Sequence, residues 1–162
     1  MRHAKAEPFA PSDHARPLTE RGIRDARAAG VHLHDRGLVP DLALVSSATR
    51  ALGTWSAVAE AFPDADVDVE VQDALFSASF ETLLETLNAL PEEEHTVLFV
   101  GHNPTAAFLC HFLDDGEGDT DAVSGLLQGF PPAALAVFEV VVPWAGLEAE
   151  TGRLVDYHAG NG

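Results

Sequence analysis

Two short apolar runs stand out along the chain, residues 42–45 and 96–100. Each has the length and the unbroken apolar character typical of a strand buried on both faces of a parallel sheet. Around these runs, apolar residues recur at every third or fourth position, which predicts amphipathic helices. The predicted helices span residues 19–36, 49–62 and 79–90, and a fourth runs from Pro104 through Leu113.

Further segments complete an alternation of strands and helices. Residues 67–71 alternate valine with acidic residues, which predicts a strand with one solvent-facing side. Residues 134–142 and 153–158 predict two late strands, and the acidic, glycine-bearing stretch 114–121 predicts a solvated loop. This order is typical of a three-layer α/β/α sandwich with a mostly parallel sheet. Because no linker divides the chain, we expect a single domain over residues 1–162.

The charge balance is strongly acidic. The 162 residues include 9 lysines and arginines and 26 aspartates and glutamates, giving a formal net charge of −17 at pH 7. Residues 1–50 hold eight bases and six acids, whereas residues 51–162 hold one base and twenty acids. Nucleic acids and anionic membranes are bound through basic patches, so this composition argues against both as broad-surface partners.

The cysteine content and the N-terminus indicate the compartment. The single cysteine, Cys110, excludes an intrachain disulfide and a multi-cysteine metal site, and we expect it to be a small core residue. No apolar run is long enough to span a membrane, and Met1-Arg2-His3 opens into charged sequence instead of the apolar core of a signal peptide. We therefore expect a cytoplasmic protein.

Polar residues follow the predicted strands. Ser46–Arg50 comes after the run 42–45, Gly101–Asn103 comes after 96–100, and Arg2-His3 lies at the start of the sequence. Ligands of open α/β sheets bind at the carboxyl ends of the strands, so one pocket could collect these side chains. Such a pocket suits phosphoryl transfer, because a neutral imidazole can attack phosphorus and guanidinium groups bind phosphoryl oxygens bidentately.

Each of these residues also has a purely structural interpretation. A histidine after a strand is often incidental, and an arginine at a helix start commonly pairs with one of the many surface carboxylates. The joint placement of Arg50 and His102 at strand ends favours the functional interpretation over the structural one.

Co-linear motifs run through nearly the whole chain. They are Arg2-His3-Ala4, the run Ser12-Asp13-His14-Ala15-Arg16-Pro17-Leu18-Thr19 with Gly22, Ser46–Ala51, Val100–Pro104, and a late run that begins Pro131-Pro132. In this order they resemble the histidine phosphatase superfamily, which has the phosphoglycerate-mutase-like fold. The run from Ser12 to Gly22 is similar to the signature of its SixA-like phosphohistidine phosphatase branch.

The resemblance implies a role for each matched residue. His3 would be the nucleophile that becomes phosphorylated, Arg2 and Arg50 would clamp the phosphoryl oxygens, and His102 would complete the catalytic set.

Three further residues would contribute to substrate binding. Asp13 and Arg16 lie in the signature loop, where they would shape the site or orient its arginines, and Asn103 would position a neighbouring group. The family uses no metal and no cofactor, and none is expected for this chain.

The sequence differs from mutase-type members of this superfamily at the residue that acts as general acid. Mutase-type relatives carry a glutamate after the third strand that protonates an oxygen leaving group, whereas residues 73–79 offer only Asp73, which we expect at a strand end. Imidazole leaves phosphorus more readily than an alkoxide does, so a phosphoramidate substrate has less need of a strong acid. The departure therefore favours phosphohistidine over sugar phosphates.

A second departure concerns the first strand. Relatives carry an apolar strand ahead of the first motif, at the centre of the sheet, whereas this sequence has only Met1 there. We therefore expect the fold to lack most of this strand, with unpaired backbone groups and an open groove beside it. An upstream start, a rebuilt N-terminus and a compromised protein remain open as explanations.

These observations predict a metal-independent phosphatase that hydrolyses phosphohistidine on a protein through a covalent phosphohistidine intermediate. A phosphomonoesterase for a small metabolite and a non-catalytic phosphate-binding module remain as alternatives. The expected partner is a phosphorylated protein or a small phosphorylated substrate, with neither nucleic acid nor membrane involved. The sequence leaves the oligomeric state open.

Overall fold

The strand β1 (Leu42–Ser46) lies at the centre of a parallel sheet in the computed structural model, which describes residues 1–160. It pairs in parallel with β2 (Asp68–Gln72) on one side and with β3 (Val97–Val100) on the other, so the order is β2-β1-β3. All five residues of β1 are buried, as its unbroken apolar run predicts.

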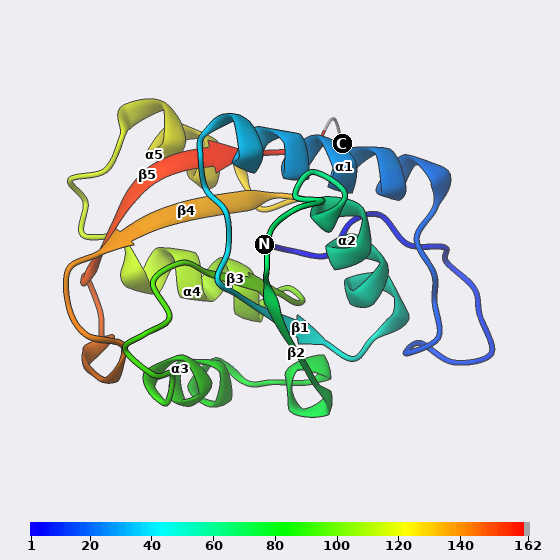
Figure 1. Ribbon diagram of the computed structural model, residues 1–162, viewed down its shortest axis with the longest axis horizontal. Coiled ribbons are helices and arrows are strands. Elements are labelled where there is room, and N and C mark those ends of the chain that lie inside the picture. Colours follow the sequence, from blue (N-terminus) through cyan, green and yellow to red (C-terminus); the bar gives the residue numbers. More distant parts are fainter. Residues whose placement is uncertain (161–162) are drawn as a thin grey trace.

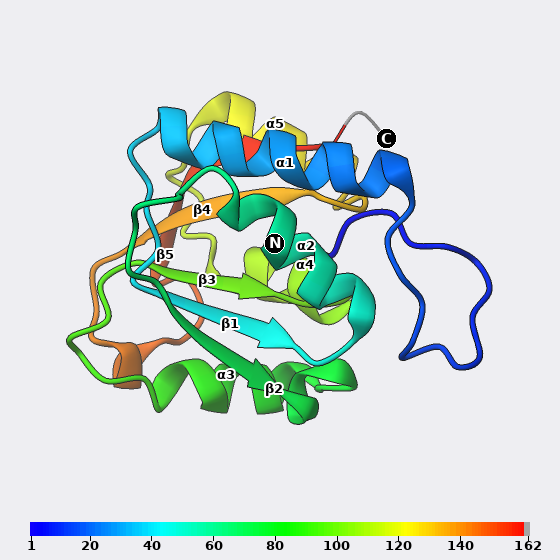
Figure 2. The same ribbon diagram turned by 45° about the vertical axis from the view of Figure 1, so that its right-hand side comes forward.

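Helices cover both faces of this sheet (Figure 1 and Figure 2). They are α1 (Glu20–Asp35), α2 (Thr49–Ala59), α3 (Phe80–Asn88), α4 (Thr105–Leu113) and α5 (Thr120–Gln128), with short 3₁₀ turns η1 (Asp73–Phe76) and η2 (Trp144–Gly146).

The alternation of side chains along β1 separates two hydrophobic cores. Ala43 and Val45 pack in the core that includes buried residues of α1 and α2, whereas Leu42 and Leu44 pack in the core formed with α3, α4 and α5. Successive residues of a strand point to opposite faces, so this division places a helical layer on each side of the sheet. The predicted three-layer α/β/α sandwich is confirmed.

The start of α1 is fixed against the N-terminal segment. The Thr19 hydroxyl accepts a hydrogen bond from the Gly22 amide at 3.0 Å and so caps the helix. The Thr19 amide donates to the Lys5 carbonyl oxygen at 2.9 Å. A Cβ at position 22 would lie 2.1 Å from that oxygen, so only glycine allows α1 to approach so closely.

Three sequence predictions need correction. The helix predicted over 49–62 ends at Ala59. The predicted strand 67–71 corresponds to β2, but Val69 and Val71 are 45% and 52% exposed, so both faces of this strand are open to solvent. The predicted loop 114–121 is interrupted by α5, which begins at Thr120 where the Asp119 side chain accepts from two backbone amides.

The two late strands form a second, antiparallel pair. β4 (Leu135–Val140) pairs with β5 (Gly152–His158), and this pair is separate from β2-β1-β3. The segment Met1–His3 lies between the two: the Gly101 amide donates to the Met1 oxygen at 3.1 Å, and the Arg2 amide donates to the Ala134 oxygen at 2.9 Å. These three residues occupy the position of a central strand, of which only the tip is paired.

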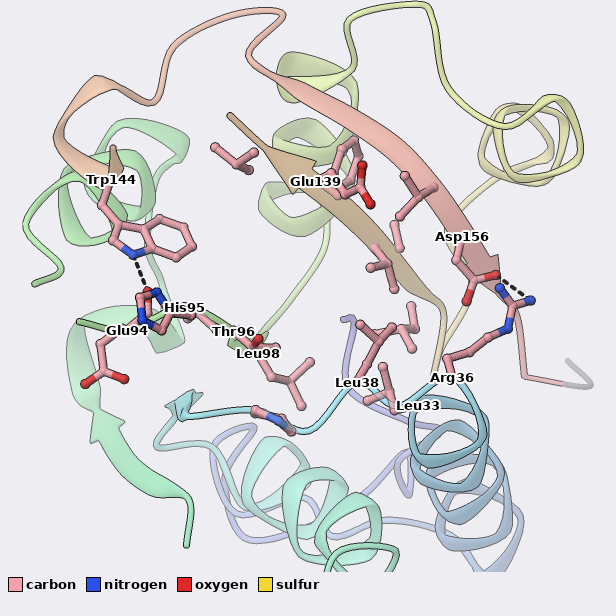
Figure 3. A pocket seen from close by; sticks show the side chains of 18 of the residues that line it. Leu33, Arg36, Leu38, Glu94, His95, Thr96, Leu98, Glu139, Trp144 and Asp156 are labelled. Carbon is pink, nitrogen blue, oxygen red and sulfur yellow. Dashed lines mark hydrogen bonds and ion pairs between the residues drawn. The ribbon is translucent and has the colours of Figure 1, made fainter. Parts of the chain in front are cut away.

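A groove of about 760 Å³ lies between β3 and β4 (Figure 3). Leu33 of α1 and Leu98 of β3 contribute apolar side chains to it. Beside the groove, the Trp144 indole N–H donates to the backbone carbonyl oxygen of Glu94 at 2.6 Å. The Arg36 guanidinium forms an ion pair with the Asp156 carboxylate at 3.1 Å. Among the described residues, the expected first strand is represented by the paired segment Met1–His3.

Filling this groove with backbone is expected to stabilise the fold. Met1 already pairs with β3 in parallel, since its nitrogen donates to the Phe99 oxygen at 2.8 Å. A five-residue segment such as Val-Thr-Val-Leu-Val fused ahead of Met1 would extend that pairing and bury apolar side chains. We expect it to raise the midpoint of thermal unfolding by about 2–8 °C, measured by calorimetry. A Gly-Ser extension of equal length is the control, and equal midpoints for the two proteins would contradict the prediction.

Candidate active site

Four of the residues selected from the sequence are positioned by neighbouring strand ends. Arg2 and His3 end the paired N-terminal segment, Arg50 lies in the first turn of α2 just beyond β1, and His102 follows β3. The carboxyl ends of parallel strands meet at one edge of the sheet, which brings these side chains together. The rings of His3 and His102 have centroids 5.1 Å apart.

The contacts of His3 determine which tautomer its imidazole ring adopts. Its Nδ1 lies 2.8 Å from the Ala4 carbonyl oxygen, which can only accept, so Nδ1 carries the hydrogen and donates. The Arg50 Nε–H points at the other ring nitrogen, Nε2, at 3.2 Å. Burial, and then the positive charges of Arg50 and Arg2, lower the pKa of His3 to about 4, although the Ala4 bond opposes the shift. At neutral pH Nε2 is therefore unprotonated, and its lone pair accepts from the Arg50 Nε–H.

Arg50 is a buried cation held on several sides, with a side chain only 7% exposed. Its Nη1 donates to the Asp13 carbonyl oxygen at 2.7 Å, and its Nη2 donates to the Asp13 carboxylate at 3.1 Å. The guanidinium carbon lies 5.7 Å from the centre of the Phe76 ring. These contacts compensate its desolvation and fix the direction of its N–H groups.

A hydrogen bond with the buried Ser46 hydroxyl fixes the His102 ring. Its Nε2 lies 2.8 Å from the Ser46 hydroxyl, and its Nδ1 lies 3.4 Å from Nη2 of Arg50. Burial, followed by the proximity of His3 and Arg50, lowers the pKa of His102 to about 4. This ring is therefore also neutral near pH 7.

Arg2 and Asn103 share one acceptor. The Arg2 Nη1 and the Asn103 side-chain amide each donate to the Phe130 carbonyl oxygen at 3.0 Å. The Nε of Arg2 is buried without a hydrogen-bond partner among the described residues, and burial lowers the pKa of this guanidinium. Arg2 thus retains donor capacity that an incoming oxyanion could use.

Asp13 and Arg16 support Arg50 from the signature loop. The Arg16 Nη1 donates to the Asp13 carboxylate at 2.8 Å, and its Nε donates to the Glu7 carbonyl oxygen at 2.7 Å. Its hydrogen bond to Arg16, together with the nearby charge of Arg50, holds the pKa of Asp13 below its ordinary value. Arg16 thus binds Asp13, which in turn binds Arg50.

Sequence reasoning assigned no role to several neighbours of this cluster. Ser46 contacts His102, while the His14 imidazole bonds to the Ser47 hydroxyl at 2.9 Å and meets the Phe76 ring edge-on. Both serines belong to the motif Ser46–Ala51. The signal available for Ser46 was its place at the end of an apolar strand, where its hydroxyl is fully buried and needs a hydrogen-bond partner.

A cavity of about 200 Å³ opens beside His102. Its walls come from Leu75, Phe76, Ser77, Ala78, Phe99, Asn103, Pro104 and Thr105 as well as His102. These walls include no carboxylate. Asp73 is exposed and follows β2 directly, as predicted, where it begins η1.

Residues 1–160 contain neither a cluster of metal-binding side chains nor a membrane-spanning helix. Within that range, no group of three or more histidine, cysteine, aspartate or glutamate residues is arranged to hold a metal ion. None of the helices in the same range is long and apolar enough to cross a membrane.

No family model matches the sequence, but whole-length relatives do. An uncharacterised protein of Mycobacterium tuberculosis is 36% identical over 98% of both chains. Among solved structures, the protein assigned as the phosphohistidine phosphatase SixA of Nakamurella multipartitia is 30% identical, with a TM-score of 0.83 over 100% of this chain and 94% of its own. The corresponding protein of Agrobacterium tumefaciens is 33% identical, with a TM-score of 0.79 over 98% and 94%. The chain therefore belongs to the histidine phosphatase superfamily, and its place within it is the SixA-like branch.

The site predicts the titration of its two histidines. We expect the ring signals of His3 and His102 in NMR spectra to shift with midpoints near pH 4, because burial and the adjacent guanidinium groups disfavour the imidazolium. The unfolded chain binds these protons near pH 6.5, so the free energy of unfolding falls as the pH drops from 6.5 toward 4. His3→Ala and His102→Ala assign the signals. Midpoints near 6.5 would contradict the described environment.

Proposed function

We propose that this histidine phosphatase hydrolyses phosphohistidine on a protein, without a metal, by transferring the phosphoryl group to Nε2 of His3. The observation that carries the proposal is the unprotonated Nε2 beside the fixed Arg50 guanidinium. A lone pair held at this position, with permanent cations around it, suits attack on a phosphoryl group.

The first step exchanges one phosphorus–nitrogen bond for another. The His3 Nε2 lone pair forms a bond to phosphorus while the bond to the substrate imidazole breaks, and that imidazole leaves with the bonding electrons. When the other nitrogen of the substrate ring carries a solvent proton, the leaving group is a neutral imidazole. His3 becomes positively charged as its bond to phosphorus forms, and the Ala4 carbonyl oxygen that accepts from Nδ1 stabilises that charge.

The second step regenerates the enzyme. A water oxygen attacks phosphorus, the bond to Nε2 breaks, and His3 returns to the neutral form with its hydrogen on Nδ1. The protons of the water leave with the product, as dihydrogen phosphate, and pass from it to solvent. Arg2, Arg50 and His102 bind the equatorial oxygens in both steps, and the two guanidinium groups stay charged throughout.

The absence of a carboxylate from the walls of the 200 Å³ cavity supports a phosphoramidate substrate. An alkoxide leaving group needs a proton donor, whereas imidazole does not need a strong one. Asp13 is unsuited to that task, because Arg16 and Arg50 hold it as a carboxylate.

His3→Ala is expected to abolish turnover. We expect its rate on a phosphohistidine-containing protein to fall by at least about a thousandfold, and wild-type enzyme quenched during turnover to carry acid-labile phosphate that His3→Ala lacks. The rate of the wild type is expected to be unchanged in excess chelator. Full activity of a folded His3→Ala protein would overturn the covalent mechanism.

The substrate preference is testable at the cavity. We expect kcat/KM for phosphohistidine protein to exceed that for a panel of sugar phosphates by at least about a hundredfold, because no acid protonates an alkoxide. Ala78→Glu adds a carboxyl group to the cavity wall and is expected to narrow this gap, whereas the matched Ala78→Gln leaves it unchanged. Comparable rates for both substrate classes in the wild-type protein would favour a phosphomonoesterase.

A further inference from the structure

Ser46 is the last residue of β1 and has no exposed surface. Its hydroxyl lies beneath the catalytic cluster, with Oγ 2.8 Å from Nε2 of His102. A buried hydroxyl at the end of an otherwise apolar strand needs a hydrogen-bonding partner, and His102 is the side chain that provides one.

The hydrogen bonds of Ser46 leave its proton available to His102. The Ser46 oxygen accepts from the Ala48 backbone amide at 3.3 Å, a contact that uses one lone pair and not the hydroxyl hydrogen. A neutral imidazole carries its hydrogen on one nitrogen and accepts on the other. If the Ser46 hydroxyl donates to Nε2, the hydrogen of His102 must sit on Nδ1.

The groups around Nδ1 show how the tautomer with hydrogen on Nδ1 would bind a phosphoryl oxygen. Nδ1 lies 3.4 Å from Nη2 of Arg50, which is a permanent donor. In the empty site Nδ1 can accept from this Nη2–H. When a phosphoryl oxygen lies beside both groups, a hydrogen on Nδ1 allows that oxygen to accept from both of them. With the hydrogen on Nε2 instead, Nδ1 would present a lone pair that repels the same oxygen.

We propose that Ser46 is a positioning residue that holds His102 in the form with hydrogen on Nδ1, so that Nδ1–H and Arg50 Nη2 donate to one phosphoryl oxygen. This inference rests on the proposed function, since it concerns how His102 meets the transferring group. Ser46 itself touches neither substrate nor phosphorus.

The kinetic test compares two adjacent serines. Ser46→Ala is expected to lower kcat on phosphohistidine protein by about 10- to 100-fold with a small change in KM, because His102 loses its orientation toward the transferring group. Ser47→Ala is the matched control, since its hydroxyl bonds to His14 instead, and its kcat is expected to stay within about twofold of wild type. Thermal unfolding of both variants establishes that they fold. Equal rates for Ser46→Ala and wild type would overturn the inference.

A second readout does not depend on turnover. In ¹⁵N NMR spectra of the protein saturated with tungstate, a phosphoryl mimic, we expect the hydrogen of His102 on Nδ1 in wild type and in Ser46→Thr, which keeps the hydroxyl. Ser46→Ala is expected to show a mixture of both ring forms. A hydrogen on Nε2 in the tungstate-loaded wild type would overturn the inference even in an active enzyme. Failure of the proposed function would instead appear as wild-type protein without phosphohistidine hydrolysis.

Discussion

The pairing of Met1, Arg2 and His3 between two strand systems is the constraint on which this structure depends. The His3 amide donates to the Gly101 oxygen at 2.9 Å, and the Ala133 amide donates to the His3 oxygen at 3.2 Å. A nucleophile set in this way between two sheets has its backbone fixed from both sides, and the contacts with Ala4 and Arg50 orient its ring. The same few hydrogen bonds connect β3 to the start of β4 and place the nucleophile beside His102.

The electrostatics of the site follow from burial in an acidic protein. A formal charge of −17 surrounds a pocket whose cations come from the first third of the sequence. Arg50 is buried with Asp13 as its counter-ion, and Asp13 is shared with Arg16. The site keeps an excess of positive charge when empty, because it holds Arg2, Arg16 and Arg50 against the single carboxylate of Asp13. An incoming phosphoryl group therefore meets fixed donors without drawing mobile side chains from solvent.

The parts of the site that depend on position along a strand or helix could be predicted from the sequence. Arg50 and His102 follow buried apolar runs, and the carboxyl ends of parallel strands meet, so their convergence was predictable. The α5 helix was missed because its first turn lies within an acidic, glycine-bearing stretch whose composition favours a loop. The contact between Ser46 and His102 joins residues 56 apart in the chain, and no local pattern encodes which nitrogen a hydroxyl will face. Both faces of β2 are open to solvent, which hydrophobic periodicity does not specify.

The groove between β3 and β4 also bears on how two molecules of this protein meet in solution. Strand edges that lack a partner are templates for another chain, and β3 and β4 face each other across this groove with only their ends joined by Met1–His3. Two molecules that each carry a charge of −17 repel each other before such edges can meet. Salt shortens the range of this repulsion to about 8 Å at physiological ionic strength. The acidity of this protein therefore opposes association across this groove, and that opposition weakens as ionic strength rises.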